Sequence, residues 1–493
     1  MNRRRSTATS SFGVGKREGH NASAFYERFA APVLSDDETV AYLEVASTLG
    51  RGQSILGSST TIDLPDNSVA LVVTSPPYFV GKDYETAFAG NGTDHEIPTS
   101  YIEFLELLRD VFAECARVLE PGGRIAVNVA NLGRKPYRSL SADITTILQD
   151  DLGLLLRGEV LWQKGKTSSG SCAWGSFAKA GNPVLRDVTE RVIIASKGRF
   201  SRAIKPAERV KQGLPNRSTL TNDEFVDATK DVWEFDAESA TRIGHPAPFP
   251  VDLPRRLIEL YTYVDDIVLD PFGGAGTTLV AAARTGRIGV CYDIDPDFVA
   301  LAASRLETEL ERADGLASAA TDLAAGDALT GDERQDLNYT RALAASKKVG
   351  DIAKDHLIAA GFTITKEGPK VPGAGIDFDF EVGASDGSRF YVDVAGAYTS
   401  AKPGLQRVEL LWRTIGRIQV LKAVDPSARV LVLTPSAPRP KTQADRAIRL
   451  CGPSTVFDLI ELFDQDALER LSHYASGGPV QPGFWTAQQT QPD

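Results

Sequence analysis

A short motif early in the chain brings together residue types that can hold a flat, hydrogen-bonding ligand. Ser75, Pro76, Pro77 and Tyr78 follow the apolar run 69–73, which predicts a buried strand of a parallel sheet. Proline has a fixed φ and no amide hydrogen, so the two prolines end the strand and form a rigid turn. A hydroxyl, a fixed carbonyl and an aromatic ring at the carboxyl end of a strand suit the exocyclic amino group of a nucleobase. Taken alone, the motif also fits a simple Pro-Pro surface turn.

A second motif has the glycine spacing of a nucleotide-binding turn. Residues 267–278 read Ile-Val-Leu-Asp-Pro-Phe-Gly-Gly-Ala-Gly-Thr-Thr, which predicts a strand, a glycine-rich turn and the start of a helix. Glycines allow the backbone to approach a ligand closely, and the first amides of the helix point toward it. Asp293 ends the next apolar run, 288–293, at about 20 residues after Asp270, where nucleotide-binding sheets place the carboxylate that binds ribose hydroxyls. The glycine turn is a weak signal alone, and the two motifs together are a strong one.

Together, these motifs resemble those of the DNA amino-methyltransferases that use S-adenosylmethionine. The stretch 270–276 resembles the family's cofactor motif, and 75–78 resembles its catalytic motif. The catalytic motif comes first here, which is the permuted, beta-type order, and the resemblance covers roughly residues 60–306. Ser-Pro-Pro-Tyr is typical of N4-cytosine enzymes, whereas N6-adenine enzymes typically have Asp or Asn in the first position. The resemblance therefore implies S-adenosyl-L-methionine as cofactor, double-stranded DNA as substrate and the N4 amino group of a flipped-out cytosine as methyl acceptor.

The resemblance also implies a role for the residues of the catalytic motif. The Ser75 hydroxyl and the Pro76 carbonyl would accept hydrogen bonds from the two amino hydrogens. Tyr78 and Phe79 would stack on the flipped base. The hydrogen bonds would pull the amino nitrogen toward tetrahedral geometry and free its lone pair for attack on the methyl sulfonium. Orientation and charge stabilisation would then suffice for catalysis, with neither a metal ion nor a covalent intermediate.

The same resemblance assigns the cofactor to the glycine turn and to the strand after it. Asp293 would hold the ribose hydroxyls, and the turn residues would shape the pocket for the methionine end. Asp270 would order the turn and face the amino group of the cofactor. The expected cofactor-binding residues are Asp270, Phe272, Gly274, Gly276, Thr277 and Asp293.

The charge distribution limits where DNA could bind. The net charge is −11, which argues against a uniformly basic surface, but residues 133–217 contain 16 Lys and Arg against 7 Asp and Glu. This local excess, with its small-residue loops, predicts a target-recognition region over about 133–230. A tryptophan in such a region is more often buried than stacked on a base. The expected DNA and base contacts are Phe79, Lys82, Lys164, Trp174 and Arg186.

The elements that must position these residues are those of an open α/β sheet. Continuous apolar runs predict strands, and apolar residues at helical spacing predict amphipathic helices. The further strands are expected over 124–130, 158–164 and 189–197, and the helices over 101–119, 254–263 and 297–310. We therefore expect an α/β protein with a Rossmann-like methyltransferase sheet in permuted motif order, plus a smaller C-terminal α/β domain.

At 493 residues the chain exceeds one ordinary hydrophobic core, so several domains are expected. An acidic linker is predicted because the stretch 307–341 holds nine acidic and three basic residues with many alanines. The expected units are a flexible basic N-terminus over 1–22, a methyltransferase domain over 23–310, the linker over 311–345 and a C-terminal domain over 346–493.

The C-terminal segment resembles a second superfamily, the PD-(D/E)xK nucleases. The resemblance lies in the predicted order helix 347–360, strands 362–365, 376–382 and 389–394, helix 405–424 and strand 429–434. It places Asp377 and Asp393 on adjacent strands as the metal carboxylates. The chain departs from the family at Ala395, where the lysine belongs, and Lys402 would have to reach in from elsewhere. We therefore expect a restriction-endonuclease-like domain without nuclease activity, with a generic accessory or dimerisation domain as the other reading.

The remaining composition indicates a soluble, cytoplasmic enzyme without a metal site. The four cysteines are scattered, without disulfide or metal spacing, and are expected to be reduced thiols. The chain has five histidines and no Cys/His cluster, and His245 is expected to be structural. No apolar run is long enough to span a bilayer, and no hydrophobic segment follows the basic start of the chain.

Other functions fit parts of the same pattern. The enzyme could act on N6 of adenine or, less readily, on RNA or a protein amide. A working C-terminal nuclease would make the chain a fused restriction-modification protein; otherwise a cognate restriction endonuclease is an expected partner. A non-catalytic DNA-binding protein on the same fold is a further alternative, against which the intact Ser75–Tyr78 motif and glycine turn count.

Overall fold

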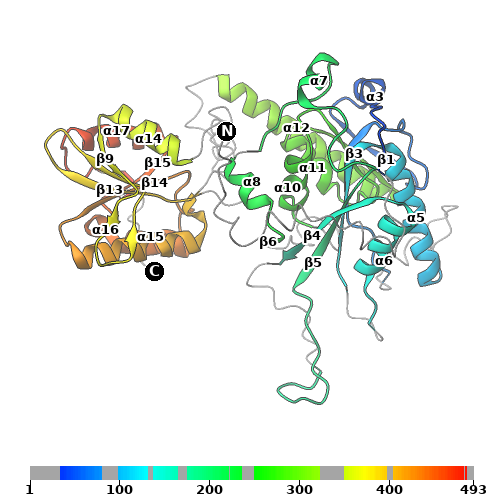
Figure 1. The fold of residues 1–493 in the computed structure, drawn as a ribbon, viewed down its shortest axis with the longest axis horizontal. Coiled ribbons are helices and arrows are strands. Elements are labelled where there is room, and N and C mark those ends of the chain that lie inside the picture. Colours follow the sequence, from blue (N-terminus) through cyan, green and yellow to red (C-terminus); the bar gives the residue numbers. More distant parts are fainter. Residues whose placement is uncertain are drawn as a thin grey trace, which may run out of the picture.

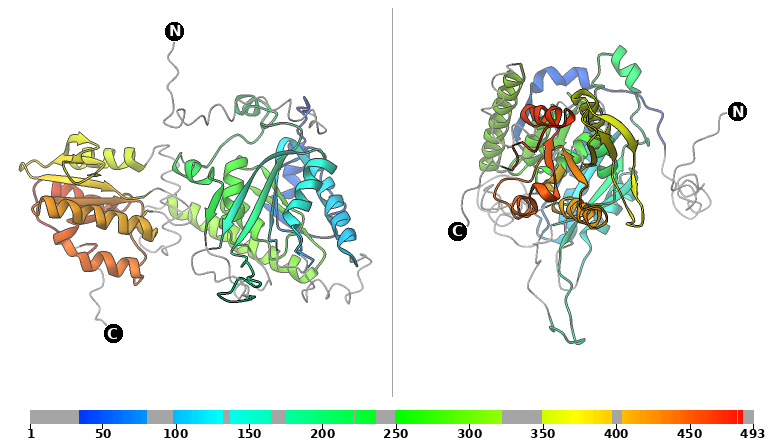
Figure 2. Two further views of the ribbon diagram at one scale, coloured as in Figure 1. Left: turned by 60° about the horizontal axis from the view of Figure 1, so that its bottom comes forward. Right: turned by 90° about the vertical axis from the view of Figure 1, so that its left-hand side faces the viewer.

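Two α/β units make up the molecule, one built on an eight-stranded sheet and the other on a five-stranded sheet among the residues described. They lie side by side in Figure 1 and appear as two lobes in the left view of Figure 2. The computed structural model describes residues 34–79, 98–131, 137–164, 175–220, 222–235, 249–321, 349–396, 404–481 and 483–485. The expected α/β class, with a smaller C-terminal unit, is confirmed.

The larger sheet is mixed and mostly parallel. Its strands, in spatial order, are β1 (Gly52–Leu56), β8 (Ile288–Asp293), β7 (Ile267–Asp270), β2 (Val69–Thr74), β3 (Leu119–Val129), β5 (Thr189–Ser196), β4 (Leu155–Gln163) and β6 (Val232–Glu234). The strands from β1 to β3 run parallel to one another. β5 is antiparallel to both of its neighbours, and β6 is parallel to β4. This is the Rossmann-like arrangement expected from the sequence.

Helices cover both faces of this sheet. They are α3 (Tyr42–Leu49), α5 (Tyr101–Val118), α6 (Leu140–Thr146) with a following π-helical turn (Ile147–Asp151), α7 (Pro206–Lys211), α8 (Asn222–Ala228), α10 (Asp252–Tyr261), α11 (Thr277–Arg284) and α12 (Pro296–Thr321). Side chains alternate along a strand, so Val72 of β2 packs in one cluster with Phe112 of α5, and Val73 packs in another with Leu257 of α10. β2 is consequently buried along its whole length.

The helix expected over 101–119 is confirmed as α5, and its start is set by capping. The Ser100 side chain accepts a hydrogen bond from the Glu103 amide (3.2 Å), and the Glu103 carboxylate in turn accepts one from the Thr99 amide (2.7 Å). This reciprocal arrangement satisfies amides that the first helical turn leaves without partners. The helix then directs Phe104 and Leu108 into the core beneath β2 and β3.

β7 and β2 are adjacent strands near the middle of the sheet. Leu71 and Val72 of β2 pair in parallel with Val268 and Leu269 of β7. The chain leaves β7 through α11 toward β8, and it leaves β2 through α5 toward β3, on the opposite side. The two connections therefore diverge between β7 and β2, and such a switch point is where open α/β sheets bind ligands. Both sequence motifs follow these strands directly.

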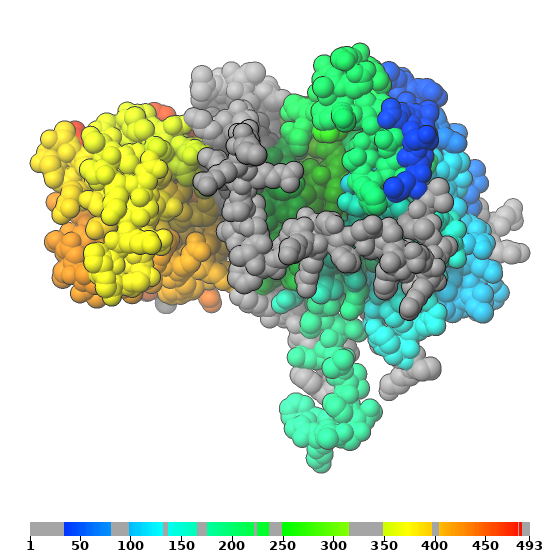
Figure 3. All heavy atoms as spheres, in the orientation of Figure 1, coloured from blue at the N-terminus to red at the C-terminus, as the bar shows by residue number. Residues whose placement is uncertain are grey.

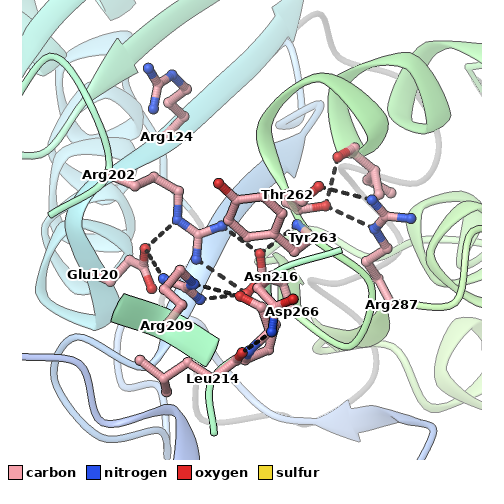
Figure 4. A network of polar contacts seen from close by, with 12 residues as sticks. Glu120, Arg124, Arg202, Arg209, Leu214, Asn216, Thr262, Tyr263, Asp266 and Arg287 are labelled. Atoms are coloured by element: carbon pink, nitrogen blue, oxygen red, sulfur yellow. Dashed lines mark hydrogen bonds and ion pairs between the residues drawn. The ribbon is translucent and has the colours of Figure 1, made fainter. Parts of the chain in front are cut away.

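A buried ion-pair network closes the opposite, amino-terminal edge of the sheet (Figure 4). Arg202 and Arg209 share Glu120, at the start of β3, and Asp266, just before β7. Arg209 and both carboxylates are at most 2% exposed. Nearby, Lys197 donates to the Asn67 side chain and to two carbonyls. Two positive and two negative groups are thus buried together, which offsets the cost of removing each charge from water.

This network concerns one part, 197–217, of the target-recognition region expected over 133–230. The stretch 197–217 is tied to the amino-terminal edge, because Gly122 donates its amide to the Lys197 carbonyl and Val264 donates to the Arg217 carbonyl. The carboxyl ends of the parallel strands, which carry both motifs, lie at the other edge. Several of the basic residues that give this region its positive charge therefore stabilise the fold, and they lie at the opposite edge of the sheet from Ser75.

The C-terminal unit has a five-stranded mixed sheet between helices. Its strands in spatial order are β15 (Asp458–Glu461), β14 (Arg429–Thr434), β13 (Arg389–Val394), β12 (Phe380–Gly383) and β9 (Thr363–Glu367), and its helices are α14 (Val349–Ala360), α15 (Val408–Val424), α16 (Gln443–Thr455) and α17 (Gln465–Ala475). β13, β14 and β15 are parallel, and β12 is antiparallel to β13 and β9. Separate apolar clusters fill the two faces of this sheet.

The single strand expected over 376–382 is wrong. The chain forms β11 (Ile376–Asp377), which pairs with β10 (Lys370–Val371) outside the main sheet, and then β12. Phe378, between the two strands, is buried in the same apolar cluster as Val371, so the chain turns there to bury the ring. The strand pattern of the sequence does not show this turn.

α12 continues to Thr321, so the range 311–345, expected as an acidic linker, begins with helix. The two units touch through an ion pair between Arg407, just before α15, and Asp227 of α8 (3.3 Å). Asp227 also pairs with Arg256 of α10 at 3.1 Å. No helix in the described ranges combines the length and apolar character needed to cross a bilayer.

Candidate active site

A buried carboxylate joins the two sequence motifs at the switch point. Asp270 accepts hydrogen bonds from the Thr74 hydroxyl (2.7 Å), the Phe272 amide (3.1 Å) and the Thr278 hydroxyl (2.7 Å). Thr74 is the last residue before Ser75, and Phe272 and Thr278 flank the glycine turn. Asp270 is 1% exposed, and burial raises its pKa to about 7. Asp270 therefore orders the turn, with both its oxygens bound to protein donors, and its contact with a cofactor amino group stays a prediction.

The turn after β2 brings the Ser75 and Tyr78 side chains together. Their hydroxyl oxygens are 2.9 Å apart, and the Tyr78 hydroxyl lies 3.5 Å from a carboxylate oxygen of Glu190. Pro76 is buried and Tyr78 is 8% exposed, while Ser75 and Pro77 are half-buried. The rigid Pro-Pro turn thus holds a hydroxyl pair at the carboxyl end of the central strand, as its sequence predicts.

Phe79, which the sequence predicts to stack on the base together with Tyr78, packs its ring against α5. Its backbone has φ +51°, which is uncommon for a bulky residue, and its ring stacks on Phe104 of α5 with centroids 5.3 Å apart. Tyr101 completes the aromatic group at 6.2 Å. The backbone thus directs the half-buried ring of Phe79 toward α5, and stacking of this ring on a base stays a prediction.

A polar cluster that sequence reasoning missed lies next to the Ser75–Tyr78 pair. Glu190 of β5, 7% exposed, accepts from the Asn128 side chain (2.5 Å) and forms an ion pair with Lys164 (2.5 Å). Lys164 was expected to contact DNA, and here it neutralises a buried carboxylate. For Asn128 a signal did exist in the sequence, because it is the single polar residue in the apolar run 125–130; Glu190 gives no such signal, since Thr189 and Arg191 beside it are also polar.

Asn128 also carries an unused acceptor. Its Oδ1 atom has no hydrogen-bond partner among the described residues, although the residue is 1% exposed. The amide orientation is set by Glu190, since only the NH₂ group can donate to that carboxylate. Buried acceptors without donors are uncommon and cost free energy. The Ser75–Tyr78 side of the sheet therefore offers a carboxylate, two hydroxyls and a free amide oxygen in one group.

The glycine turn after β7 is packed tightly against β8. Gly273 donates its amide to the Tyr292 carbonyl (2.8 Å), and a Cβ at this position would lie 2.7 Å from the Cys291 side chain. Gly274 and Gly276 have φ of +49° and +72°, which favour glycine. The Arg305 side chain donates to the Ala275 carbonyl and holds the turn from α12.

The donors and acceptors of this turn fit a nucleotide with ribose hydroxyls and a carboxylate. Asp293, at the end of β8, accepts from the Gly274 and Asp295 amides (2.8 and 2.9 Å), which leaves each oxygen able to accept once more. Burial raises the pKa of Asp293. The N-cap of α11 is Gly276, which has no side chain to take the first helical amides, so those amides suit an anionic group. Thr277 is buried at the helix start.

The remaining DNA-contact candidates divide into two groups. Arg186 is exposed on the connection between β4 and β5. Lys82 and Trp174 lie outside the described residues, as does His245.

The C-terminal carboxylates are not arranged as the nuclease resemblance implies. Asp393 of β13 is fully buried, pairs with Arg417 of α15 and accepts from the Thr414 hydroxyl (2.7 Å). Asp377 lies on β11 and not on the adjacent strand; Asp379, beside β12, is the carboxylate that accepts from the Val394 amide (2.7 Å). Lys402 lies outside the described residues, and Ala395 is buried. In the part of the chain that is described, no group of three His, Cys, Asp or Glu residues could hold a metal ion.

Residues 69–304 match the sequence profile of a family described as DNA methylase. Type II methyltransferase M.MjaI of Methanocaldococcus jannaschii is 31% identical over 271 residues, covering 49% of this chain and 86% of that protein. M.MthZI of Methanothermobacter thermautotrophicus is 30% identical, covering 50% of this chain and 74% of its own length. The type II beta methyltransferase M.BslI of a Bacillus strain is 26% identical over 59% of this chain, but the match spans only 32% of its length.

Solved structures similar to this chain include methyltransferases. A DNA modification methylase of Thermus thermophilus, in complex with S-adenosyl-L-methionine, is 28% identical with a TM-score of 0.39, over 52% of this chain and 94% of its own. The PvuII DNA methyltransferase, described as cytosine-N4-specific, is 19% identical with a TM-score of 0.40, over 60% of this chain and 94% of its own.

Proposed function

This chain belongs to the DNA methylase family, and we propose that it transfers a methyl group to the exocyclic N4 amino group of a flipped-out cytosine in double-stranded DNA. One observation carries the proposal. Asp270 binds Thr74 on one side and Thr278 on the other, so a single buried carboxylate fixes the Ser75 turn against the glycine turn. A base held at the first turn and a cofactor held at the second would meet at the switch point between β2 and β7.

S-adenosyl-L-methionine is the cofactor of this family, and when bound it supplies an electrophilic methyl group on a sulfonium. The residues of the glycine turn fit it. Asp293 has acceptor capacity for the ribose hydroxyls, and the first amides of α11, behind Gly276, suit the methionine carboxylate. Phe272 is partly buried beside the Ser75 turn, where it would cover the methionine end of the pocket.

The Ser75 hydroxyl would orient the amino nitrogen of the base. In the free protein this hydroxyl is paired with the Tyr78 hydroxyl at 2.9 Å, so an entering amino group would take the place of that partner. The Pro76 carbonyl, fixed by the Pro-Pro turn, would accept the second amino hydrogen. With both hydrogens held, the nitrogen lone pair is directed toward the cofactor side of the switch point.

The amino nitrogen loses one proton after methylation, and the side chains near Ser75 offer it a route. Ser75, Tyr78 and the Glu190 carboxylate follow one another at 2.9 and 3.5 Å. Lys164 and Asn128 keep this carboxylate in position and partly neutralised. Proton transfer through hydroxyls to a buried carboxylate is ordinary acid–base chemistry at these separations once the longer contact tightens on binding.

The choice of cytosine rests on Ser75, since the related N6-adenine enzymes typically have Asp or Asn at that position. N6-adenine methylation is therefore the alternative. A type II restriction-modification context, with a separate cognate endonuclease, is proposed from the names of the relatives. We do not propose that this chain cleaves DNA, because the Asp393 carboxylate, which a nuclease would need to bind a metal ion, forms an ion pair with Arg417.

The direct test is nucleoside mass spectrometry of DNA incubated with the intact chain and S-adenosyl-L-methionine. We expect N4-methylcytosine, and we expect it to disappear in Ser75→Ala while cofactor binding persists. N6-methyladenine alone would move the assignment to adenine, and unmethylated DNA from a chain that binds cofactor would contradict methyl transfer to DNA.

A further inference from the structure

The connection between β4 and β5 projects from the same edge of the sheet as the candidate active site. We name its described part, residues 175–188, the arm. β4 runs in the same direction as β3, because both are antiparallel to β5. The arm therefore leaves the sheet at the carboxyl edge, where Ser75 lies. Figure 1 shows it extending well past the neighbouring elements, and in Figure 3 it stands out from the body of the molecule.

The root of the arm is built into the active-site cluster. The Lys164 amide, at the end of β4, donates to the Val188 carbonyl (3.1 Å), which continues the strand pairing. The Lys164 side chain pairs with Glu190, and Glu190 approaches the Tyr78 hydroxyl. The base of the arm is thus held by the same carboxylate that contacts the Ser75–Tyr78 pair.

The far end of the arm has a fixed shape. Gly175 forms a bridge with Pro183, and the Ser176 amide donates to the Asn182 carbonyl (2.9 Å). The Ser176 hydroxyl donates to the Lys179 carbonyl (2.9 Å) and accepts from the Asn182 amide (2.6 Å). These bonds close a small turn, so its side chains are presented without an ordering step on binding.

The arm presents apolar side chains to solvent. Leu185 is 95% exposed, Phe177 71% and Val184 40%. Burial of an apolar side chain is favourable, so a fixed arm that exposes Leu185, Phe177 and Val184 indicates a surface that is covered in a complex. Lys179 and Arg186, both exposed, lie between and beside them, which suits a partner with an apolar interior and an anionic exterior.

A DNA duplex with one base removed from its stack is such a partner. Flipping a base leaves an apolar gap between its neighbours and costs the stacking energy of that base. Proteins that distort DNA fill such gaps with Phe, Leu, Ile or Met. We propose that Leu185 enters the stack at the gap left by the target base, with Phe177 and Val184 against its edge and Lys179 and Arg186 on the phosphates. This inference rests on the proposed methylation of a flipped base.

The test compares Leu185→Ala with a matched control, Leu450→Ala, since Leu450 of α16 is 87% exposed in the other unit. The recognition sequence is first read by single-molecule sequencing of DNA from cells expressing the chain. Two duplexes carrying it are used, one fully paired and one lacking the base opposite the target, which makes flipping easier. We expect Leu185→Ala to lower the single-turnover methylation rate about 10- to 100-fold on the paired duplex and by less than about threefold on the other. Leu450→Ala should match the intact chain on both.

An equal loss of methylation rate on both duplexes, or no loss on the paired duplex, would contradict insertion of Leu185 into the stack. Equilibrium binding of the same duplexes separates this inference from the proposed function, because binding does not require methyl transfer. If the intact chain binds DNA but transfers no methyl group, the proposed methylation is wrong. A loss of affinity in Leu185→Ala that is confined to the paired duplex would still support insertion of Leu185 into the stack. If the arm instead docks a protein, Leu185→Ala leaves both DNA affinities unchanged, and the inference is wrong.

Discussion

At the scale of single residues, the site depends on two buried carboxylates with different tasks. Asp270 is held by three donors and joins the two motifs, whereas Glu190 is held by Lys164 and Asn128 beside the reacting edge. The first can be recognised from the sequence, because it precedes the glycine turn. The second cannot, because its partners come from three separate strands or strand ends and are brought together only by the sheet.

Glu190→Gln should lower the rate of methyl transfer about 10- to 100-fold with little change in cofactor affinity, because the glutamine keeps the shape but cannot take a proton. Single-turnover rates and cofactor titration measure the two effects. Glu159→Gln is the matched control, since Glu159 forms an ion pair with Arg191 on the same two strands at the surface. A parallel drop in cofactor affinity would show that Glu190 is only structural.

Asp270 predicts a specific pH dependence of stability. Its folded pKa of about 7 lies above the ordinary 3.8, so the stabilisation of the protonated form is complete below pH 3.8 and is lost as pH rises through 7. Asp270→Asn has no such dependence. Its stability relative to the unmodified chain should therefore rise by roughly 2–3 kcal/mol between pH 5 and pH 8. Urea unfolding at both pH values measures this difference, and a pH-independent difference would contradict the raised pKa.

At the scale of elements, the sequence predicts well where apolar periodicity and capping agree. The helix over 101–119 and the strands over 189–197 and 389–394 appear within one residue of their expected ends. Prediction from the sequence fails where contacts with residues distant in the chain decide the conformation. The predicted strand over 376–382 is two strands because Phe378 between them is buried. The basic stretch 197–217 lies at the opposite edge of the sheet from the site because Arg202 and Arg209 form ion pairs with Asp266.

The network in Figure 4 should be essential for stability and irrelevant to chemistry. Asp266→Asn leaves Arg202 and Arg209 buried with one remaining carboxylate, Glu120, which should cost about 3–5 kcal/mol. Asp265→Asn is the matched control: this neighbour is exposed with φ +70°, a conformation that asparagine adopts readily. Urea unfolding should separate the two variants, while methyl transfer at low temperature should be unchanged in both. Loss of activity in a fully folded Asp266→Asn protein would show that this edge also acts in catalysis.

At the scale of the whole molecule, the two units have separate cores. Apolar clusters fill both faces of the C-terminal unit's own sheet, and an ion pair between Arg407 and Asp227 joins this unit to the larger one. Every residue assigned to methyl transfer lies before Leu306. Units with independent cores usually fold independently. The sequence predicts the same order of units, with a linker over 311–345 whose first residues belong to α12.

Deletion of residues 345–493 should therefore leave methyl transfer within about threefold of the intact chain while it changes DNA affinity, site preference or assembly. Methylation rates at saturating DNA, together with binding isotherms, distinguish these effects. The point variant Arg407→Gln, which breaks the ion pair but keeps the domain, controls for loss of the contact alone. A truncated chain that folds and binds cofactor but does not methylate at any DNA concentration would contradict the separation.

The same unit should not cleave DNA. A metal-dependent nuclease needs its carboxylates free to bind the ion, and Asp393 is buried with its oxygens taken by Arg417 and the Thr414 hydroxyl. Releasing it would leave the Arg417 charge without its partner, which is costly in a buried site. Incubation of unmodified plasmid with the intact chain and Mg²⁺ or Mn²⁺ should thus leave the DNA supercoiled. Nicking that disappears in Asp393→Ala but persists in the control variant Asp425→Ala, at a half-buried aspartate that binds Ser427 after α15, would show that the ion pair opens and that the unit is a working nuclease.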